Sequence, residues 1–429
     1  MSPTISPTLK TTALLGLLSI GLLSACSDDD DASGPASCED SWECTDFVEA
    51  SALSVMRHGH DAIAMSDGKV LMIQGSARES LDIPASSYTN SWELYDTETD
   101  EVVVAGGENE LVNRRHGFPD NAYLEGQGVL RLGGIFRSNP NADGTPLTSV
   151  EFFSSSSQEW TRLDDTDFPL SNVDVLADGD VLAYDINDTS DGPTFQAQFF
   201  NTSDLEWRSG MDASVPGYET PDGFQNNGIQ FFDGHAMADG TIFGLVNFEF
   251  EEMEPEDDAP PIIVYLFTAL TYDPDSGEVT IIDDFGDAFG VDVNTSIDAL
   301  PNSDDVIFHL QYADEFDDEL NPDYLPTQLY RYSPGGSELE LITERDPHPG
   351  DVGLILPGDE ILYTNPDFLQ TYDITNDIWR DFNQFPPNLR YSSMILLDDC
   401  RLFVSGQQTL DASLTDDVLT EYDTGYCMP

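Results

Sequence analysis

One short phrase recurs seven times along the chain and constrains its fold more than any other feature. An aromatic residue is followed by Asp, Ser or Asn and then by a polar turn. The copies are Tyr95-Asp96, Phe153-Ser154, Phe200-Asn201, Tyr272-Asp273, Tyr332-Ser333, Tyr372-Asp373 and Tyr422-Asp423. Successive aromatic residues stand 40 to 72 positions apart, which is the range of repeats built from four-stranded sheets. The repetition therefore predicts a repeat architecture. The recurring aromatic and polar residues are expected to have a structural role in it.

A second phrase, a tight turn followed by β-branched and aliphatic residues, precedes each aromatic phrase. Its clearest copy is residues 60–75, where Asp67-Gly68 separates two apolar runs. Asp-Gly favours a hairpin because it accepts the positive φ that a tight turn demands. Parallel turns stand at Asp178-Gly179, Asp239-Gly240 and Gly358-Asp359, with weaker copies in 124–134, 301–310 and 397–406. Each repeat is thus expected to contribute four strands.

Seven four-stranded units predict an all-β fold in which blades pack in a ring. A single four-stranded sheet is marginally stable, whereas packing in a ring buries both of its faces and leaves short edges. Helical periodicity is hard to find after residue 40, and 33 Gly with 26 Pro suit many short strands. We expect a seven-bladed β-propeller, and the irregularity of the repeats leaves six or eight blades open.

The repeats resemble those of the Kelch family over residues 42–429. The residues that carry the resemblance are Arg57-His58-Gly59-His60, Asp67-Gly68, Arg115-His116-Gly117, Gly133-Gly134 and the run from Ser149 to Trp160. Only one repeat has the complete double glycine, and repeats 3 to 6 lack the opening Arg. The resemblance implies a Kelch-like propeller similar to the central domain of galactose oxidase.

The two ends of the chain are expected to complete one blade together. The phrase at Tyr422 would need its apolar partner at position 429, where Pro429 stands, while Trp42 lies upstream of the first repeat. We therefore expect the N-terminal segment to pair beside the last strand, as propellers of the Kelch type often do. Four cysteines map to this blade, and three pairings are open. We favour Cys38–Cys44 with Cys400–Cys427; a pairing between the termini and four free thiols are the alternatives.

The first residues carry the signals of an exported lipoprotein. An apolar stretch of about a dozen residues, too short to span a bilayer comfortably, ends in Leu23-Ser24-Ala25-Cys26. This is a lipobox, which predicts a signal peptide over 1–25, acylation of Cys26 and an acidic disordered tether through residue 37 before a propeller over 38–429. Ser27 stands where Gram-negative lipoproteins retained in the inner membrane carry Asp, so we expect the outer membrane. The alternative is ordinary secretory cleavage with Cys26 left as a thiol.

The charge of the chain excludes some partners. There are 82 acidic and 15 basic residues, giving a formal charge of −67. Nucleic acids and anionic membrane surfaces are poor partners for such a field, so we expect membrane contact through the lipid anchor alone. Adaptation to high salt and attraction of cations or a basic protein are both compatible with the charge.

The few cationic residues gather at the openings of repeats that would be neighbours in a ring. These candidates for ligand binding are Arg57, His58 and His60 in repeat 1, Arg115 and His116 in repeat 2, and Arg390 and Tyr391 in repeat 7. Guanidinium groups hold carboxylate or sulfate through paired hydrogen bonds. The pattern predicts an anion site at one mouth of the channel. The alternative is a structural role, since Kelch repeats often place Arg there to pair with neighbouring acids and main chain.

One polar loop resembles a calcium turn. Asn139, Asn141 and Asp143 have the spacing of oxygen ligands in such loops, but Val150 stands where an acidic ligand is expected. Calcium is the one cofactor that the sequence leaves open, and a simple polar turn is the alternative.

No pattern identifies an enzyme. The chain lacks a GxSxG elbow, and the assignment of the cysteines to one blade argues against the Tyr–Cys crosslink of a copper-radical oxidase. We expect a monomeric binding module that recognises a protein or an anionic glycan. The alternative is an enzyme acting on carboxylated sugars, like the sialic-acid epimerases built on Kelch rings.

Overall fold

A computed structural model describes most of the chain after residue 47. The described residues are 48–49, 60–74, 91–106, 116–136, 145–170, 172–189, 192–216, 224–252, 263–284, 297–300, 303–310, 313–316, 322–324, 326–345, 352–356, 358–365, 368–382, 389–397, 401–410 and 413–423. All of them belong to one compact unit, Glu39–Pro429. Regular structure in these ranges is entirely β-strand, as the sequence predicts.

Antiparallel pairing assembles the strands into sheets of at least four strands, and one further ribbon of two. The first sheets are β2 (Asp61–Met65), β3 (Lys69–Ile73), β4 (Trp92–Asp96) and β5 (Glu101–Gly106); β6 (His116–Leu124), β7 (Gly128–Phe136), β9 (Glu151–Ser154) and β10 (Glu159–Arg162) with β8 (Thr145–Pro146); and β11 (Asn172–Val175), β12 (Val181–Thr189), β13 (Gly192–Asn201) and β14 (Glu206–Ser209) with β15 (Ala213–Ser214).

The later sheets follow the same order of strands. They are β16 (Phe224–Ala236), β17 (Ile242–Glu252), β18 (Ile263–Asp273) and β19 (Glu278–Asp284); β20 (Ile297–Ala299), β21 (Val306–Leu310), β24 (Thr327–Tyr332) and β25 (Glu340–Arg345), interrupted by the ribbon of β22 (Ala313–Phe316) and β23 (Pro322–Tyr324); and β26 (Val352–Leu356), β27 (Glu360–Asn365), β28 (Phe368–Asp373) and β29 (Ile378–Phe382). Each of these six sheets draws its strands from one continuous stretch of chain.

A further sheet combines both ends of the chain. It contains β30 (Leu389–Leu396), β31 (Arg401–Leu410) and β32 (Ser413–Asp423), with β1 (Val48–Glu49) along the free edge of β32. Val48 pairs with Glu421 and Glu49 with Thr420. The predicted pairing of the N-terminal segment beside the last strand is thus confirmed at residues 48–49. Trp42 and the cysteines at 26, 38, 44, 400 and 427 lie outside the described residues.

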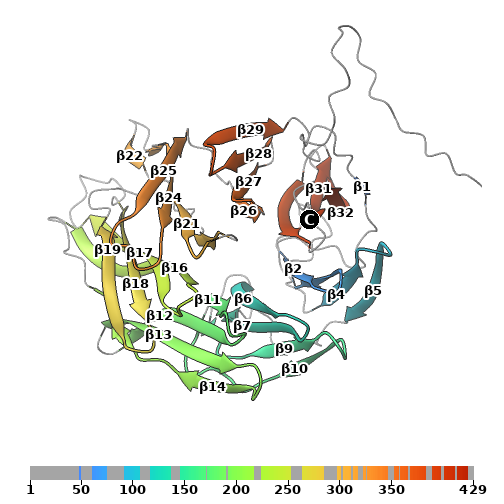
Figure 1. The fold of residues 1–429 in the computed structure, drawn as a ribbon, viewed down its shortest axis with the longest axis horizontal. Helices are drawn as coiled ribbons and strands as arrows, with labels where there is room; N and C mark the ends of the chain where they lie inside the picture. Colours follow the sequence, from blue (N-terminus) through green and yellow to red (C-terminus); the bar gives the residue numbers. More distant parts are fainter. Residues whose placement is uncertain are drawn as a thin grey trace, which may run out of the picture. The chain divides into compact units, whose positions relative to one another are not determined.

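The sheets are arranged around a centre as in a β-propeller (Figure 1). The first strand of each sheet contacts the first strand of its neighbour in the pairs β30–β2, β2–β6, β6–β11, β11–β16 and β16–β20, and β26 contacts β30. These innermost strands therefore line the middle of the ring. The all-β propeller expected from the sequence is confirmed.

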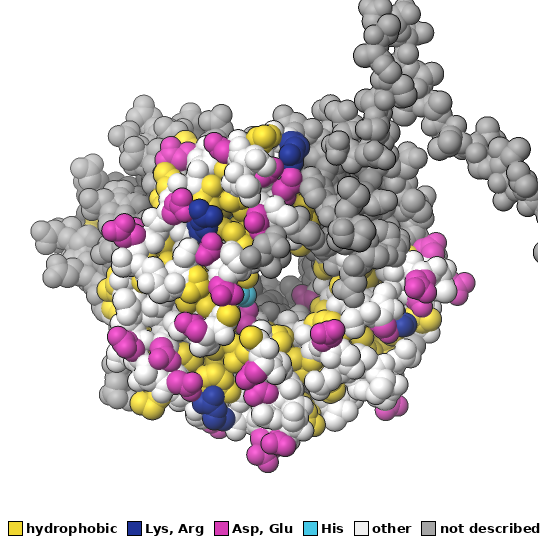
Figure 2. All heavy atoms as spheres, in the orientation of Figure 1, with side chains coloured by type: hydrophobic (Ala, Val, Ile, Leu, Met, Phe, Trp, Pro, Cys, Tyr) yellow, Lys and Arg dark blue, Asp and Glu magenta, His cyan; other side chains and the backbone are white. Residues whose placement is uncertain are grey.

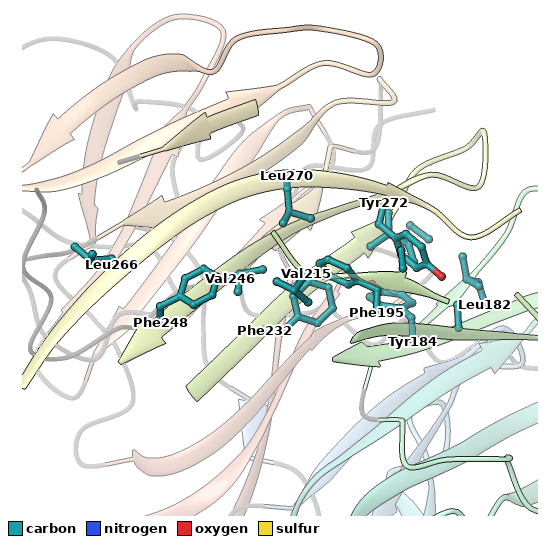
Figure 3. Packing of buried hydrophobic residues seen from close by; sticks show 14 of the residues in the cluster. Leu182, Tyr184, Phe195, Val215, Phe232, Val246, Phe248, Leu266, Leu270 and Tyr272 are labelled. Carbon is teal, nitrogen blue, oxygen red and sulfur yellow. The ribbon is translucent and has the colours of Figure 1, made fainter. Parts of the chain in front are cut away.

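The hydrophobic core lies between neighbouring sheets. Figure 3 shows one such interface, where Leu182 and Phe195 of one sheet meet Phe232 and Val246 of the next. Similar clusters join five further pairs of adjacent sheets, and in one of them Trp92 packs against Phe153. Burial contributes about 25 cal/mol per Å² of apolar surface, so each interface acts as a separate core.

The recurring aromatic phrase is a structural device. Its aromatic side chain is buried, and the next residue caps the following turn: the Asp96 carboxylate accepts hydrogen bonds from the backbone N–H groups of Glu98 and Thr99, both at 3.0 Å. The apolar residue seven positions on pairs across the strands, as Trp379 does with Tyr372, with ring centroids 4.6 Å apart. The phrase thus specifies a hairpin and its packing.

Five of these turns also hold one residue in the left-handed region, five positions after the aromatic residue. Leu205 has φ 58° there, whereas Gly277 fills the same place with φ 74°. The left-handed conformation costs a residue with a side chain roughly 1–2 kcal/mol, and Gly avoids this cost.

We predict that Leu205→Gly stabilises the protein. Leu205 is 46 % exposed, so the substitution removes backbone strain and little packing. After the greater entropy of an unfolded Gly is counted, the gain should be about 0.5–1 kcal/mol, measured by urea unfolding. The neighbouring Asp204→Gly, which lacks a positive φ, should be destabilising; equal effects of the two changes would contradict the explanation.

We predict that β1 is needed for full stability. A chain that begins at residue 51 lacks the strand that covers β32 and should unfold at a lower temperature than a chain that begins at residue 39. Thermal unfolding followed by circular dichroism compares the two. Identical transitions would mean that the pairing at 48–49 contributes nothing.

Candidate functional site

The strands that carry the predicted cationic site are neighbours at the centre of the ring. The β2 strand contacts both β30 and β6, so the openings of repeats 7, 1 and 2 are adjacent, as predicted. His116 begins β6, and Arg390 and Tyr391 lie in β30, but their side chains are outside the described set. Arg57, His58 and Arg115, and Asn139, Asn141 and Asp143 of the predicted calcium turn, lie outside the described residues.

His60 is the member of this group whose side chain is described. It is buried, and its Nε2 shares a hydrogen bond of 2.7 Å with Oγ of Ser405 on β31. This contact ties the first sheet to the composite one. His60 therefore contributes to the joint between sheets, whatever part it has in binding.

A different sector brings together titratable side chains that the sequence analysis did not single out. Asp174 lies on β11, Asp233 and His235 lie on β16, and Asp298 lies on β20. These are the innermost strands of three consecutive sheets, since β16 contacts both β11 and β20. We call these four residues the Asp/His cluster.

Asp174 on β11 joins its own sheet to the sheet of β16. Its Oδ1 lies 2.9 Å from Nδ1 of His235, and its Oδ2 accepts hydrogen bonds from the Tyr184 hydroxyl at 2.7 Å and from the Ala236 backbone N–H at 2.8 Å. These three contacts fix the carboxylate. The orientation of the imidazole follows from it.

Asp233 makes the corresponding link to the third sheet. Its Oδ2 accepts a hydrogen bond of 3.2 Å from the backbone N–H of Ile297, and Oδ1 accepts one of 3.0 Å from Gly234. Two successive inner strands thus use an Asp to bind the backbone of the next strand. The cluster is both a joint between sheets and a group of titratable side chains at the centre.

The pKa values of two members of the cluster, Asp233 and His235, are raised. Burial, with the charges of Asp298 and Asp174, raises the pKa of Asp233 to about 7, although the Gly234 and Ile297 N–H groups oppose this. Burial alone would lower the pKa of His235, but its hydrogen bond to Asp174 and the surrounding negative charge raise it overall. A carboxyl group whose pKa is raised to about 7 thus lies beside an imidazole whose pKa is also raised.

Comparison of the sheets shows that three of them have polar residues where the other four have apolar ones. The position compared is the one on the innermost strand that pairs with Leu71 in the first sheet, and with Leu130, Leu182, Phe243, Ile307, Leu362 or Phe403 in the others. Its occupants are Ile63, Ala122, Leu354 and Ile395 in four sheets, but Asp174, His235 and Asp298 in the other three. The signal was thus present in the sequence, but it becomes visible only after the innermost strands are aligned by their pairing.

The cluster has access to the middle of the ring. The side chain of His235 is 26 % exposed and that of Asp174 is 15 % exposed. Figure 2 shows a hollow between the sheets with histidine and acidic side chains at its edge. A ligand entering this hollow would meet polar groups there.

Two other buried polar residues are parts of the framework. Arg131 on β7 donates to Gln74 at 2.7 Å and to Asp61 on β2 at 3.2 Å, which joins two sheets. His309 on β21 is buried against the Tyr363 hydroxyl, and burial lowers its pKa to about 4. Neither has the exposure of His235.

Within the described residues, no group of three or more His, Cys, Asp or Glu side chains has an arrangement that would hold a metal ion. The same part of the chain contains no apolar helix of membrane-spanning length.

Comparison with known proteins shows the fold but no family. No family model matches the chain, and no curated protein matches it in sequence. A fungal alcohol oxidase of the AA5 family, solved in complex with copper, aligns with a TM-score of 0.51 and 10 % identity over 88 % of this chain and 76 % of its own. An oligogalacturonate lyase in complex with manganese aligns with a TM-score of 0.49 and 8 % identity over 88 % and 96 %. At such identity, the first match supports the propeller fold alone.

We predict that Asp233→Asn stabilises the protein, and more so at alkaline pH. Between about pH 4 and pH 7 the folded state keeps a proton on Asp233 that the unfolded chain has lost, so this residue lowers stability as pH rises through that window. Asn removes the cost of an ionised buried group. The gain should reach about 2–4 kcal/mol at pH 8 and shrink towards pH 4 in urea unfolding.

The control for this prediction is Asp164→Asn, which removes one negative charge from an exposed position. It should change stability little at either pH. A gain for Asp233→Asn that does not depend on pH would contradict the raised pKa.

Proposed function

We propose that the protein is a lipid-anchored, seven-bladed propeller of the cell envelope that binds a carboxylated glycan in its central hollow. The composite sheet of β1 and β30–β32 would be the blade that closes the ring. Acylation of Cys26 would anchor the monomer to the outer membrane, with residues 27–37 as the tether. Calcium at Asn139, Asn141 and Asp143, and disulfides among the other four cysteines, remain part of this proposal.

The observation that carries the proposal is the concentration of polar, titratable groups on inner strands. The Asp/His cluster lies on β11, β16 and β20. Its strand β11 contacts β6, which belongs to the cationic sector, the part of the ring formed by the openings of repeats 7, 1 and 2 with Arg57, Arg115 and Arg390. Sugar hydroxyls donate hydrogen bonds to carboxylates, while a ligand carboxylate would pair with Arg57, Arg115 or Arg390. Adjacent acidic and cationic sectors suit a ligand that has both hydroxyl and carboxylate groups.

An enzyme acting on carboxylated sugars is the second candidate. The observation that favours it is the placement of Asp233, whose pKa is raised to about 7, two residues from His235, whose pKa is raised by Asp174, on the same strand β16. General acid–base catalysis works best when such groups titrate close to the working pH. Recognition of a protein partner by the loops of one face is the other form that a binding function would take.

Substitution of the cationic residues tests the binding proposal. Arg115→Ala and Arg390→Ala should each weaken binding of glucuronic-acid and sialic-acid glycans by roughly tenfold or more, because each removes a charged hydrogen-bond donor. Isothermal titration calorimetry, with glycans chosen from an array, measures the effect.

The matched control is Arg208→Ala, which removes an exposed arginine on the outer strand β14, where it pairs with Asp275 at 3.0 Å. This change should leave binding intact. Undiminished binding by both inner-strand variants would remove the cationic sector from the site.

A further inference from the structure

We propose that His235 transfers protons to and from a sugar bound in the central hollow, with Asp174 and Tyr184 as positioning residues. The inference takes the class of ligand, a carboxylated sugar, from the proposed function. To binding it adds a catalytic activity, carried by residues outside the cationic sector.

The first argument is the fixed orientation of the imidazole. Asp174 Oδ1 accepts the hydrogen bond from Nδ1 of His235 at 2.9 Å, while the hydroxyl of Tyr184 and the backbone N–H of Ala236 hold Oδ2. An acceptor on Nδ1 fixes the tautomer and leaves Nε2 as the nitrogen that can meet a ligand. Asp174 cannot swing away without losing its bonds to two strands.

The second argument is the cost of placing this group in the scaffold. His235 pairs with Phe243 at a position where other sheets have Ile63, Ala122 or Ile395. Apolar residues there contribute to the clusters between sheets, whereas a partly buried imidazole and carboxylate must be desolvated. Three consecutive sheets have a polar residue at this position although it is less stable there than an apolar one. Because the other four sheets do not, the polar residues indicate a local function and not a structural requirement of the repeat.

The third argument is the presence of a proton acceptor on the same face of β16. Asp233 is two residues from His235, and alternate residues of a strand share a face. The charged and titratable groups around the imidazole are Asp174 and Tyr184 from one sheet, Asp233 from its own strand and Asp298 from the next sheet. The negative charge of these carboxylates stabilises the imidazolium as a proton donor.

The simplest reaction that uses these two groups is interconversion of the anomers of a reducing sugar acid. Nε2 of the imidazolium gives its proton to the ring oxygen as the bond from that oxygen to the anomeric carbon breaks, and the bonding electron pair stays on the oxygen. The Asp233 carboxylate takes the proton of the anomeric hydroxyl, whose electrons form the carbonyl. Closure on the other face returns both protons, so no co-reactant is consumed.

The rate of anomer exchange tests the activity. The probe is D-glucuronic acid, whose α and β forms are followed by NMR. The full-length protein should accelerate the exchange. His235→Gln should reduce the acceleration by about 100-fold, and Asp174→Asn should reduce it and lower the pKa of His235. Asp239→Asn, in the exposed turn after β16, is the matched control and should leave the rate unchanged.

A nitrogen NMR spectrum tests the positioning independently of any ligand. Neutral His235 should carry its proton on Nδ1, the tautomer that is less common in free histidine. Tyr184→Phe should retain the fold and the tautomer but shift the pH profile, because Asp174 loses one donor. An Nε2–H tautomer in the wild-type protein would overturn the inference.

Binding and rate together separate the two proposals. Glycan binding without acceleration, or acceleration that His235→Gln leaves intact, would refute proton transfer by His235 and leave the proposed binding function standing. Absence of binding to every carboxylated glycan would refute the proposed function itself, and the inferred activity with it.

Discussion

Burial of apolar surface between neighbouring sheets is the interaction on which the rest of the structure depends. In the part of the chain that the structure describes, the apolar clusters lie between sheets, as Phe195 and Phe232 show across one boundary. The innermost strands are consequently held at fixed positions around the centre. Residues far apart in the sequence, such as Asp174 and His235, are brought within 2.9 Å by this packing.

The repeat and the strand content could be predicted because their signals are local, and the joining of the chain ends followed from comparing the last repeat, which lacks a partner for Tyr422, with the segment before the first. An aromatic residue, a capping Asp and an apolar partner seven positions later fit one hairpin, and the turn at Asp67-Gly68 fits another. Such hairpin signals require no knowledge of distant contacts. They also drew attention to scaffold, as the capping role of Asp96 illustrates.

The Asp/His cluster could not be predicted in the same way. Its members lie about 60 residues apart on three strands, and nothing in their immediate surroundings marks them among so many acidic residues. The raised pKa of Asp233 arises mainly from burial, which is a property of the assembled sheets. In contrast, the scarce cations were conspicuous because the chain is so acidic, and His60 among them forms a joint between sheets.

The pairing of Val48 with Glu421 has a consequence for how the chain reaches its native state. More than 370 residues separate these partners, so the composite sheet can be completed only after residues near 421 have been synthesised. Joining ends so distant carries an entropic cost of about 5 kcal/mol for a flexible chain, although docking of the sheets one after another brings them progressively closer. A nascent or truncated chain would therefore expose the unpaired edge of an incomplete sheet, and chaperones would have reason to shield it until the terminus arrives.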